Sequence, residues 1–550
     1  MKVFKKILML PLICMVINLN AQEEMSIIWE TQIEHRIQWS GTGLEGEYSY
    51  AASEKEITVF KNENGSTVWT GKFKELAPGL RQIDELIPFW DAETIFLFEK
   101  KTGKDIVACI DLNSGKQLWS TEKYKNLTDE NVVYIPEMEA FALCLKESLV
   151  FIKAKTGEEI WETAKFTGVV GKYIYNTKDQ TAVMVNFKPG GLAALFTGFK
   201  NQILRIDMKT GNIIWEATYI GRAEKKVITG EFVFDMEIQE DKVFLRMNGI
   251  QVYDYNTGAT QWTAAFDFTP DIVGSPANAK RFGVYGAVAD PVVVGNDVYV
   301  LDMSNKRNQF IKKYDLQSGK LLWTSPEIKE AKAIPNMAII GDKIILQIGG
   351  NVEAQAYIYR REVAPDGSIT IIEEWRIWYP NIKPNGLQAF NTADGSKAWE
   401  SERFRKGITN MMVDDKNVYV CSGKALYAVD YTNGADVYEI LLADDGIGLA
   451  ASILDFDGKI VVVGEKGLAT HNYVSGKLIG SAKYKTSEME ALYDNILVMK
   501  TAKADIAAYD LNTMKFKEFK AKTGAITTLR ESCKCVYVYE KKTVTKVNCL

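Results

Sequence analysis

The chain has 550 residues, of which 47% are hydrophobic and 25% charged, and no long apolar run follows the first twenty residues. This is the composition of a globular protein with an ample core, and it does not predict a membrane-spanning segment in the mature chain. The formal net charge of −5 argues against nucleic acid as a partner, because that would need a basic stripe on the surface.

Residues 1–22 resemble a secretory signal peptide. Three lysines precede an apolar segment from Ile7 to Leu19, and small Ala21 follows as a cleavage site. Ile13 is too bulky for the residue before a lipid-modified cysteine, which disfavours a lipoprotein reading of Cys14. We therefore expect an exported protein that is periplasmic, associated with the cell envelope, or secreted.

After the signal, one local pattern recurs along the chain, and it is clearest between Ile203 and Trp215. An apolar–polar alternation from Ile203 to Asp207 predicts a half-buried strand, and Asp207 and Gly211 predict a tight turn. Trp215 follows four residues after the glycine and needs a neighbour to cover it. The same glycine-to-tryptophan spacing ends at Trp69, Trp119, Trp161, Trp215, Trp262, Trp323 and Trp399.

Later copies of the pattern are less regular. Tyr438 stands where a tryptophan is expected, Gly480 follows Gly476, and Met514 replaces the turn glycine of the last copy. Successive turns are about 50 residues apart, which suits one four-stranded blade per repeat. We predict an all-β propeller over residues 23–550, with ten to eleven blades.

The two ends of the chain predict how the ring closes. The segment from Ser26 to Thr31 resembles the strand after a turn, but no partner strand precedes it. Cys535 to Glu540 and Thr543 to Leu550 form a hairpin that stops where the next turn should begin. The N-terminal strand can complete this last blade, so that no sheet edge stays open. Trp29 would then be the eighth tryptophan in the same structural position.

Three units carry insertions, at about residues 188–200, 267–287 and 351–385. The loops that join second to third strands and successive blades share one face of a propeller, so the insertions should gather on that face. In the third, Tyr357 to Glu362 and Ser368 to Trp375 predict a projecting hairpin. Exposed aromatic and apolar side chains on such loops are common interface anchors. The candidate partner surface consists of Leu195, Phe196, Phe199, Trp375, Trp378 and Tyr379.

Cysteine and histidine residues offer little catalytic chemistry. A disulfide between Cys535 and Cys549, or between Cys533 and Cys549, is favoured over metal or redox chemistry, because it would staple the closing hairpin. His35 and His471 are the two histidines of the chain, and neither stands in a motif. We expect both to be structural and assign no metal ligands.

The run Asp-x-x-[Ser/Thr]-Gly-x-x-x-Trp, at Asp111, Asp207, Asp254 and Asp315, resembles the repeat of the pyrroloquinoline-quinone-type β-propellers. That superfamily includes quinoprotein alcohol dehydrogenases and a non-catalytic propeller subunit of the outer-membrane β-barrel assembly machinery. The resemblance implies a tryptophan docked between blades. The enzymes carry adjacent cysteines against the quinone and a calcium site, and this sequence has no adjacent cysteines and no matching calcium motif. The resemblance therefore implies the non-catalytic branch, with no cofactor.

The sequence thus predicts an exported, non-catalytic propeller that serves as a scaffold for protein partners. The alternative is a small-ligand or carbohydrate site, or an enzyme, in the central funnel. Quinone-dependent dehydrogenation is disfavoured. That alternative would lose support if the insertions crossed the funnel, and it would gain support if carboxylates and aromatic side chains converged there.

Overall fold

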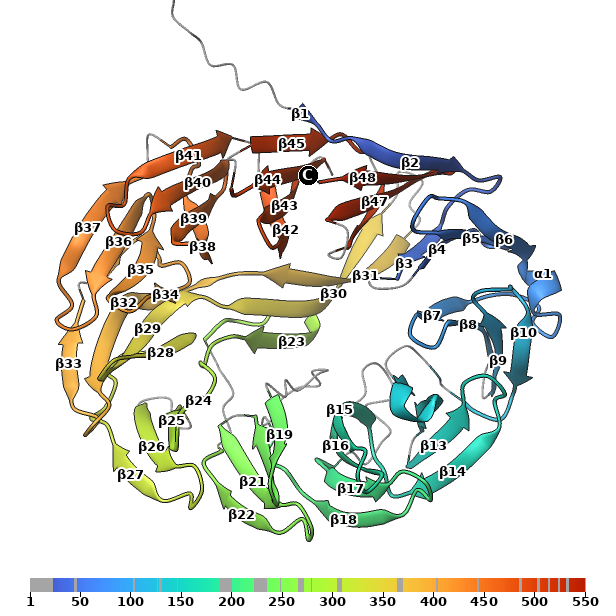
Figure 1. Cartoon of the computed structure of the whole chain (residues 1–550), viewed down its shortest axis with the longest axis horizontal. Helices are drawn as coiled ribbons and strands as arrows, with labels where there is room; N and C mark the ends of the chain where they lie inside the picture. The colour runs from blue at the N-terminus through green and yellow to red at the C-terminus, as the bar shows by residue number, and fades with distance from the viewer. Residues whose placement is uncertain are drawn as a thin grey trace, which may run out of the picture.

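The computed structural model describes residues 23–43, 47–101, 104–125, 127, 131–145, 147–187, 200–221, 235–247, 249–265, 272–277, 279–303, 309–363, 369–401, 404–442, 445–483, 487–501, 505–512, 515–522, 525–530 and 534–549. The described strands form eleven antiparallel four-stranded blades, one of which gains a fifth strand, and one further three-stranded sheet. The blades follow one another around a ring (Figure 1). The predicted all-β propeller is confirmed, and the blade number is the upper of the two expected values.

The first five blades run from the innermost to the outermost strand in chain order. Blade 1 comprises β3 (Trp39–Thr42), β4 (Tyr48–Ala52), β5 (Glu56–Lys61) and β6 (Thr67–Lys72). Blade 2 comprises β7 (Glu85–Phe89), β8 (Thr94–Lys101), β9 (Lys104–Asp111) and β10 (Gln117–Thr121). Blade 3 comprises β11 (Val132–Ile135), β12 (Ala140–Cys144), β13 (Ser148–Lys153) and β14 (Glu159–Ala164). Blade 4 comprises β15 (Val169–Asn176), β16 (Thr181–Phe187), β17 (Ile203–Asp207) and β18 (Ile213–Ala217). Blade 5 comprises β19 (Asp235–Gln239), β20 (Lys242–Arg246), β21 (Ile250–Asp254) and β22 (Thr260–Thr263).

The remaining blades include the long insertion and the closing blade. Blade 6 comprises β24 (Val292–Val294), β25 (Asp297–Asp302), β26 (Phe310–Asp315) and β27 (Leu321–Thr324). Blade 7 comprises β28 (Asn336–Ile340), β29 (Lys343–Asn351), β32 (Asn381–Asn391) and β33 (Lys397–Glu400). Blade 8 comprises β34 (Met412–Val413), β35 (Asn417–Ser422), β36 (Ala425–Asp430) and β37 (Asp436–Leu441). Blade 9 comprises β38 (Ala450–Phe456), β39 (Lys459–Gly464), β40 (Gly467–Asn472) and β41 (Leu478–Lys483).

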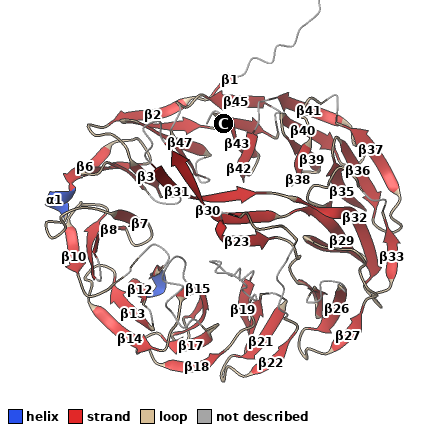
Figure 2. Cartoon of the chain, turned by 180° about the vertical axis from the view of Figure 1, so that it is seen from behind, coloured by secondary structure: helices blue, strands red, loops and turns tan. Residues whose placement is uncertain are grey.

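Blade 10 comprises β42 (Ser487–Tyr493), β43 (Ile496–Thr501), β44 (Ile506–Asp510) and β45 (Lys515–Phe519), with β1 (Glu23–Glu24) added in parallel to β45. Blade 11 comprises β46 (Ile526–Arg530), β47 (Cys535–Glu540), β48 (Thr543–Asn548) and β2 (Ile27–Gln32). The separate sheet comprises β23 (Ala279–Tyr285), β30 (Glu353–Val363) and β31 (Ile369–Trp378). The described helices are short: α1 (Phe73–Leu76) and the 3-10 turn η1 (Pro136–Met138). Strands dominate the chain when it is coloured by secondary structure (Figure 2).

The recurring turn joins the third and fourth strands of a blade, and its chemistry is local. In blade 4 the Asp207 carboxylate accepts hydrogen bonds from the backbone N–H groups of Lys209 and Thr210, each at 2.9 Å. Gly211 has φ +74°, a conformation that costs glycine little. A Cβ on Gly211 would lie 2.5 Å from the ring of Trp161 in blade 3. The glycine therefore serves both the turn and the approach of the neighbouring tryptophan.

Each tryptophan of the repeat lies against the next blade. Seven of the eight indole N–H groups donate to the carbonyl of the residue three positions before that blade's turn glycine, at 2.8–3.1 Å. The acceptors, for Trp29, Trp69, Trp119, Trp161, Trp215, Trp323 and Trp399 in order, are Asn62, Leu112, Ala154, Met208, Tyr255, Thr392 and Tyr431. Trp262 stacks on Tyr314, but its indole N–H has no partner among the described residues. Apolar residues buried between adjacent blades complete a core that follows the ring.

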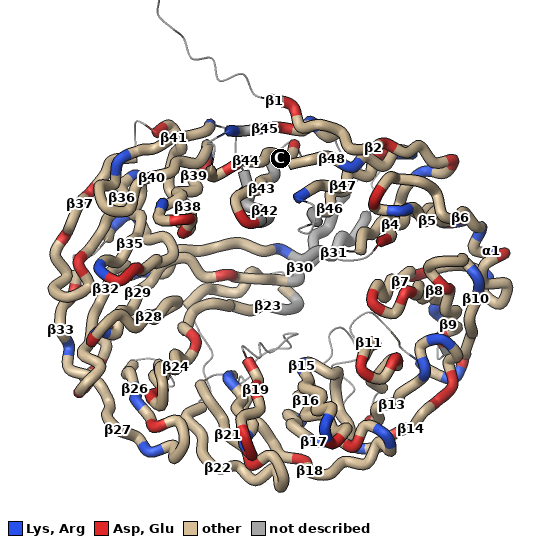
Figure 3. Tube along the Cα trace, viewed as in Figure 1, with Lys and Arg blue, Asp and Glu red and all other residues tan. Residues whose placement is uncertain are grey.

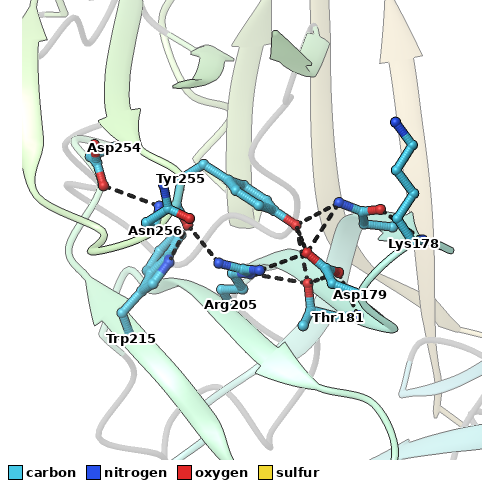
Figure 4. Close-up of polar contacts among 9 residues, drawn as sticks. Lys178, Asp179, Thr181, Arg205, Trp215, Asp254, Tyr255 and Asn256 are labelled. Atoms are coloured by element: carbon cyan, nitrogen blue, oxygen red, sulfur yellow. Dashed lines mark hydrogen bonds and ion pairs between the residues drawn. The ribbon is translucent and has the colours of Figure 1, made fainter. Parts of the chain in front are cut away.

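The interface between blades 4 and 5 also holds a polar cluster (Figure 4). The Arg205 guanidinium donates to Asp179 at 2.7 Å and to the Tyr255 carbonyl at 3.2 Å, and it lies 3.9 Å from the centre of the Tyr255 ring. Burial alone would raise the pKa of the Asp179 carboxyl, but hydrogen bonds from Thr181 and Tyr255 and the charge of Arg205 lower it below its usual value. The cluster ties the turn of one blade to the next.

The N-terminal strand closes the ring as predicted. Strand β2 pairs antiparallel with β48, with Trp29 opposite Lys546. Trp29 packs edge-on against Phe60 of blade 1 at 5.9 Å and against Tyr537 of blade 11 at 5.8 Å. Its indole N–H and the Lys546 ammonium both donate to the Asn62 carbonyl. The closing contact therefore repeats the contact between other blades.

One local prediction is wrong. Strand β17 is not half-buried, because Arg205 is buried with its apolar neighbours in the contact with blade 5. The first strand of blade 8 is short, Met412–Val413. There the Asn410 side chain donates to the Ile453 carbonyl and accepts from the Ile453 N–H, so it bonds to blade 9.

The predicted Cys535–Cys549 disulfide is also wrong, as is the Cys533–Cys549 alternative, because Cys549 is a free buried thiol. Cys535 is disulfide-bonded, but not to Cys549. Cys535 lies opposite Asn548 in the β47–β48 pair, and adjacent residues of a strand point to opposite faces. Accordingly, Cys535 packs with Trp29 and Tyr537 on one face of blade 11, and Cys549 packs on the other face.

Candidate functional site

The most distinctive part of the molecule is the three-stranded sheet outside the blades. Strands β30 and β31 continue β29 and β32 of blade 7 as a long hairpin, and β23, from the insertion before blade 6, pairs along β30. Seen down the ring axis from either side, β30 and β31 run across the interior toward blade 11 (Figures 1 and 2). The predicted hairpin is confirmed, and two insertions far apart in sequence meet in one sheet.

The hairpin leaves blade 7 through a bulge that requires glycine. The pairing of β29 with β32 shifts register between Ile348 and Gly350. Gly349 has φ +71°, and a Cβ there would lie 2.1 Å from the Pro384 carbonyl oxygen. No side chain fits at this position, because the clash is with backbone. The bulge fixes the direction in which the insertion departs.

The predicted partner surface is only partly described. Leu195, Phe196 and Phe199 lie outside the described residues, and so does the side chain of Trp375, although its backbone belongs to β31. Trp378 is half-buried and stacks on Phe282 of β23 with ring centres 5.9 Å apart. Tyr379 is 64% exposed, next to Ile377 at 53%. The Trp378 ring thus joins the two insertions, whereas Ile377 and Tyr379 face solvent.

A cavity of about 930 Å³ opens where the hairpin leaves blade 7. Four segments form its wall: Gln309, residues 327–332, residues 383–385, and residues 404–405. Backbone hydrogen bonds join neighbouring segments, from Ile328 to Gln309 at 2.9 Å and from Phe404 to Asn385 at 3.0 Å. All of these segments belong to loops or strand ends on the face that carries the insertion.

The lining of this cavity is predominantly basic. Its charged residues are Lys329, Lys332, Lys383 and Arg405 against Glu327 and Glu330, which is four positive and two negative charges, a formal +2. The four cationic side chains are on exposed residues and make no ion pair with any described residue. Over the rest of the ring, acidic and basic residues are interspersed (Figure 3). A basic cavity is thus a local feature of a chain whose net charge is negative.

Asn385 is the buried polar residue of the cavity wall. It is 2% exposed, and its side-chain Nδ2 donates to the Phe404 carbonyl at 3.4 Å. This bond sets the orientation of the amide, because the reverse orientation would place two oxygens together. The Asn385 Oδ1 atom has no hydrogen-bond partner among the described residues. This oxygen is not accessible to solvent, and a Cβ on Gly349 would lie 2.8 Å from it, so it faces the bulge of β29.

The described histidines and free cysteines are buried in the fold. The His35 Nε2 lies 3.0 Å from the Thr58 hydroxyl, and His471 contacts the Gly476 carbonyl and Asp445. Burial raises the pKa of the Cys109 and Cys144 thiols to about 12, which keeps both un-ionised near neutral pH. Within the described residues, no group of three or more His, Cys, Asp or Glu is placed to hold a metal ion.

Residues 20–264 match the family model described as outer membrane protein assembly factor BamB. Over these residues the chain carries pyrroloquinoline-quinone-like β-propeller repeats. The match covers the first five blades, where the repeat is most regular, and ends before the insertion sheet and the basic cavity. Among the described residues, no helix of this propeller is long and apolar enough to cross a membrane. No curated protein matches the chain.

Three solved structures illustrate its similarity to other proteins. BamB from Moraxella catarrhalis is 13% identical, with a TM-score of 0.30, over 69% of this chain and 92% of that one. The computationally designed Ika8 protein is 12% identical, with a TM-score of 0.34, over 69% and 96%. A eukaryotic initiation factor is 10% identical, with a TM-score of 0.35, over 82% and 98%.

Sequence reasoning identified the insertion of blade 7 but missed the cavity at its base. Lys329, Lys383 and Arg405 are far apart in the sequence and belong to no motif. One signal was available. In a propeller, inter-blade loops and second-to-third-strand loops share a face, which places the segments of Lys329, Lys383 and Arg405 together. It does not reveal which of their side chains converge.

Proposed function

We propose that this protein is an exported, non-catalytic propeller that serves as a protein-interaction scaffold in the bacterial cell envelope. The insertion sheet carries this proposal, because it is a strand-built platform added to one face of an otherwise regular ring. Its exposed residues Ile377 and Tyr379 are of the types that anchor protein interfaces. The match of residues 20–264 to a family of outer membrane protein assembly factors supports an envelope location and protein partners.

The signal peptide belongs to the same proposal. Residues 1–22 lie outside the described part of the chain, and the described chain begins at β1, which pairs with the outer strand of blade 10. Cleavage near Gln22 would leave this strand and the ring-closing strand β2 intact. The mature protein would then keep a closed ring after export.

The central-funnel alternative has less support. Strands β30 and β31 run across the ring interior as seen down its axis, which is the arrangement expected to weaken that alternative. We therefore favour partner binding on the insertion face over ligand binding at the ring axis. Enzymatic activity is not part of this proposal, and no quinone or metal is assigned to the protein.

A pull-down from envelope extract tests the scaffold role. In the test variant, Val352–Pro380 is replaced by Asn-Gly, a two-residue turn that can join the paired residues Asn351 and Asn381. A second variant, Ile377→Ser with Tyr379→Ser, changes only exposed side chains. We expect wild type to recover defined envelope proteins and both variants to lose them, with unchanged thermal unfolding in the serine variant. Equal recovery by all three proteins would refute the scaffold role of this face.

A further inference from the structure

The basic cavity at the base of the insertion has the size and construction of a ligand site. A volume of about 930 Å³ lies within the range of pockets that enclose most of a ligand's surface. Its wall is built from loops and a strand end of blades 6 and 7, and backbone hydrogen bonds join neighbouring segments. Beneath the wall, Ile328, Ala333 and Ile348 are fully or almost fully buried. The cavity thus rests on a packed core.

The charges of the wall favour an anionic ligand. Lys329 and Lys332 come from the loop after blade 6, Lys383 from β32, and Arg405 from the loop after blade 7. Because none of these four side chains is paired with a described residue, their hydrogen-bond donors are available to carboxylates. Two glutamates of the wall reduce the formal charge to +2, which favours a ligand of moderate charge over a dense polyanion.

The proposed scaffold function selects the kind of anion. An exposed segment of a partner protein can present several carboxylates that are separated by neutral residues. This spacing of charge suits a wall of four cations and two carboxylates.

We propose that this cavity binds an acidic peptide segment of the partner protein. The inference rests on the proposed scaffold function, and it names the chemistry by which the insertion face recognises its partner. Carboxylates of the segment pair with Lys383 and Arg405, two of the four exposed cations of the wall. Binding of this kind weakens as salt screens the exposed charges.

Fluorescence anisotropy with a labelled ten-residue peptide of alternating glutamate and glycine tests this inference on the full mature chain. The test variant is Lys383→Gln with Arg405→Gln, both at exposed positions. The matched control is Lys116→Gln with Lys209→Gln, which removes two exposed lysines from turns on the other face. We expect wild type and control to bind the peptide and the test variant to bind it at least fivefold more weakly. Binding by wild type should also weaken between 50 and 500 mM salt, where the screening length falls from roughly 14 to roughly 4 Å.

Two altered probes separate the parts of the argument without changing the protein. A peptide with glutamine in place of glutamate should not bind, because it lacks the carboxylates. Polygalacturonate carries carboxylates and hydroxyls but no N–H. If it displaces the glutamate peptide at lower concentration than unlabelled peptide does, the site is one for acidic glycans and the proposal is wrong.

The remaining outcomes distinguish this inference from the scaffold function. If wild type does not bind the glutamate peptide, or if both lysine-and-arginine variants lose it equally, the peptide site is refuted. Recovery of envelope partners by wild type in the same preparation would show that the scaffold role stands without it. If neither partners nor peptide bind to folded wild type, both proposals are wrong.

Discussion

The contact between blades predicts an unequal cost for two similar substitutions. Trp161 and Trp215 are each 7% exposed and each donates an indole hydrogen bond of 2.8 Å to the next blade. Replacing either by alanine should cost about 3–5 kcal/mol of unfolding free energy, because a large buried ring is removed. Replacement by phenylalanine keeps most of the ring and removes the N–H.

The phenylalanine variants should differ, because the acceptors differ. The Tyr255 carbonyl also accepts from Arg205 at 3.2 Å, whereas the Met208 carbonyl has no second described donor. Trp161→Phe therefore leaves a buried carbonyl without a partner, at about 1–3 kcal/mol, and Trp215→Phe loses only one of two bonds, at about 0.5–1.5 kcal/mol.

Urea unfolding followed by far-UV circular dichroism measures these differences, provided that the slope of the transition is unchanged between variants. We expect Trp161→Phe to be less stable than Trp215→Phe by about 1 kcal/mol, which is the difference between the two hydrogen-bond losses. Equal midpoints for the two phenylalanine variants would contradict the shared-acceptor argument. An alanine variant that unfolds like wild type would contradict the docking of tryptophan between blades.

Further predictions concern turns, acid stability and thiols. Gly258→Ala should destabilise more than Gly286→Ala in thermal melts, because both have positive φ but only the Gly258 Cβ would meet a ring, 2.5 Å from Trp215. The pKa of Asp179 is lower in the folded protein, so this carboxylate contributes stability that is present above its unfolded pKa of about 4 and is lost as pH falls through its folded value. Asp179→Asn should therefore lower the melting temperature at pH 6, and by progressively less toward pH 2. A difference in melting temperature that stays constant with pH would contradict the assignment. Alkylation of the denatured chain should label Cys549 without reductant and Cys535 only with it, as read by peptide mass spectrometry; the reverse order would contradict the described thiol states.

The repeat made the fold accessible from sequence, because its determinants are local. Asp207 and Gly211 specify a turn through their own backbone preferences, and the turn places Trp215 at the outer strand. The N-terminal strand with Trp29 lacked a partner strand near it in the sequence, and the closing blade lacked an outer strand, so the two could be paired. Local chemistry repeated around a ring is sufficient to define its topology.

The errors have the opposite character, because they depend on neighbours far away in the sequence. Arg205 fits a half-buried strand by polarity, yet Asp179 and the Tyr255 carbonyl allow its burial. Cys535 and Cys549 are close along a hairpin, yet strand alternation sends them to opposite faces. The cavity was missed for the same reason, since its cations come from separate loops.

Site-specific photo-crosslinking tests the scaffold account most directly. A photoreactive amino acid is placed at Tyr379, exposed on the insertion face, or at Lys209, exposed on a turn of the other face, and the exported protein is irradiated in intact cells. The account predicts adducts with a defined envelope protein from position 379 and none of that protein from position 209. Equal adducts from both positions, or adducts only from position 209, would contradict it.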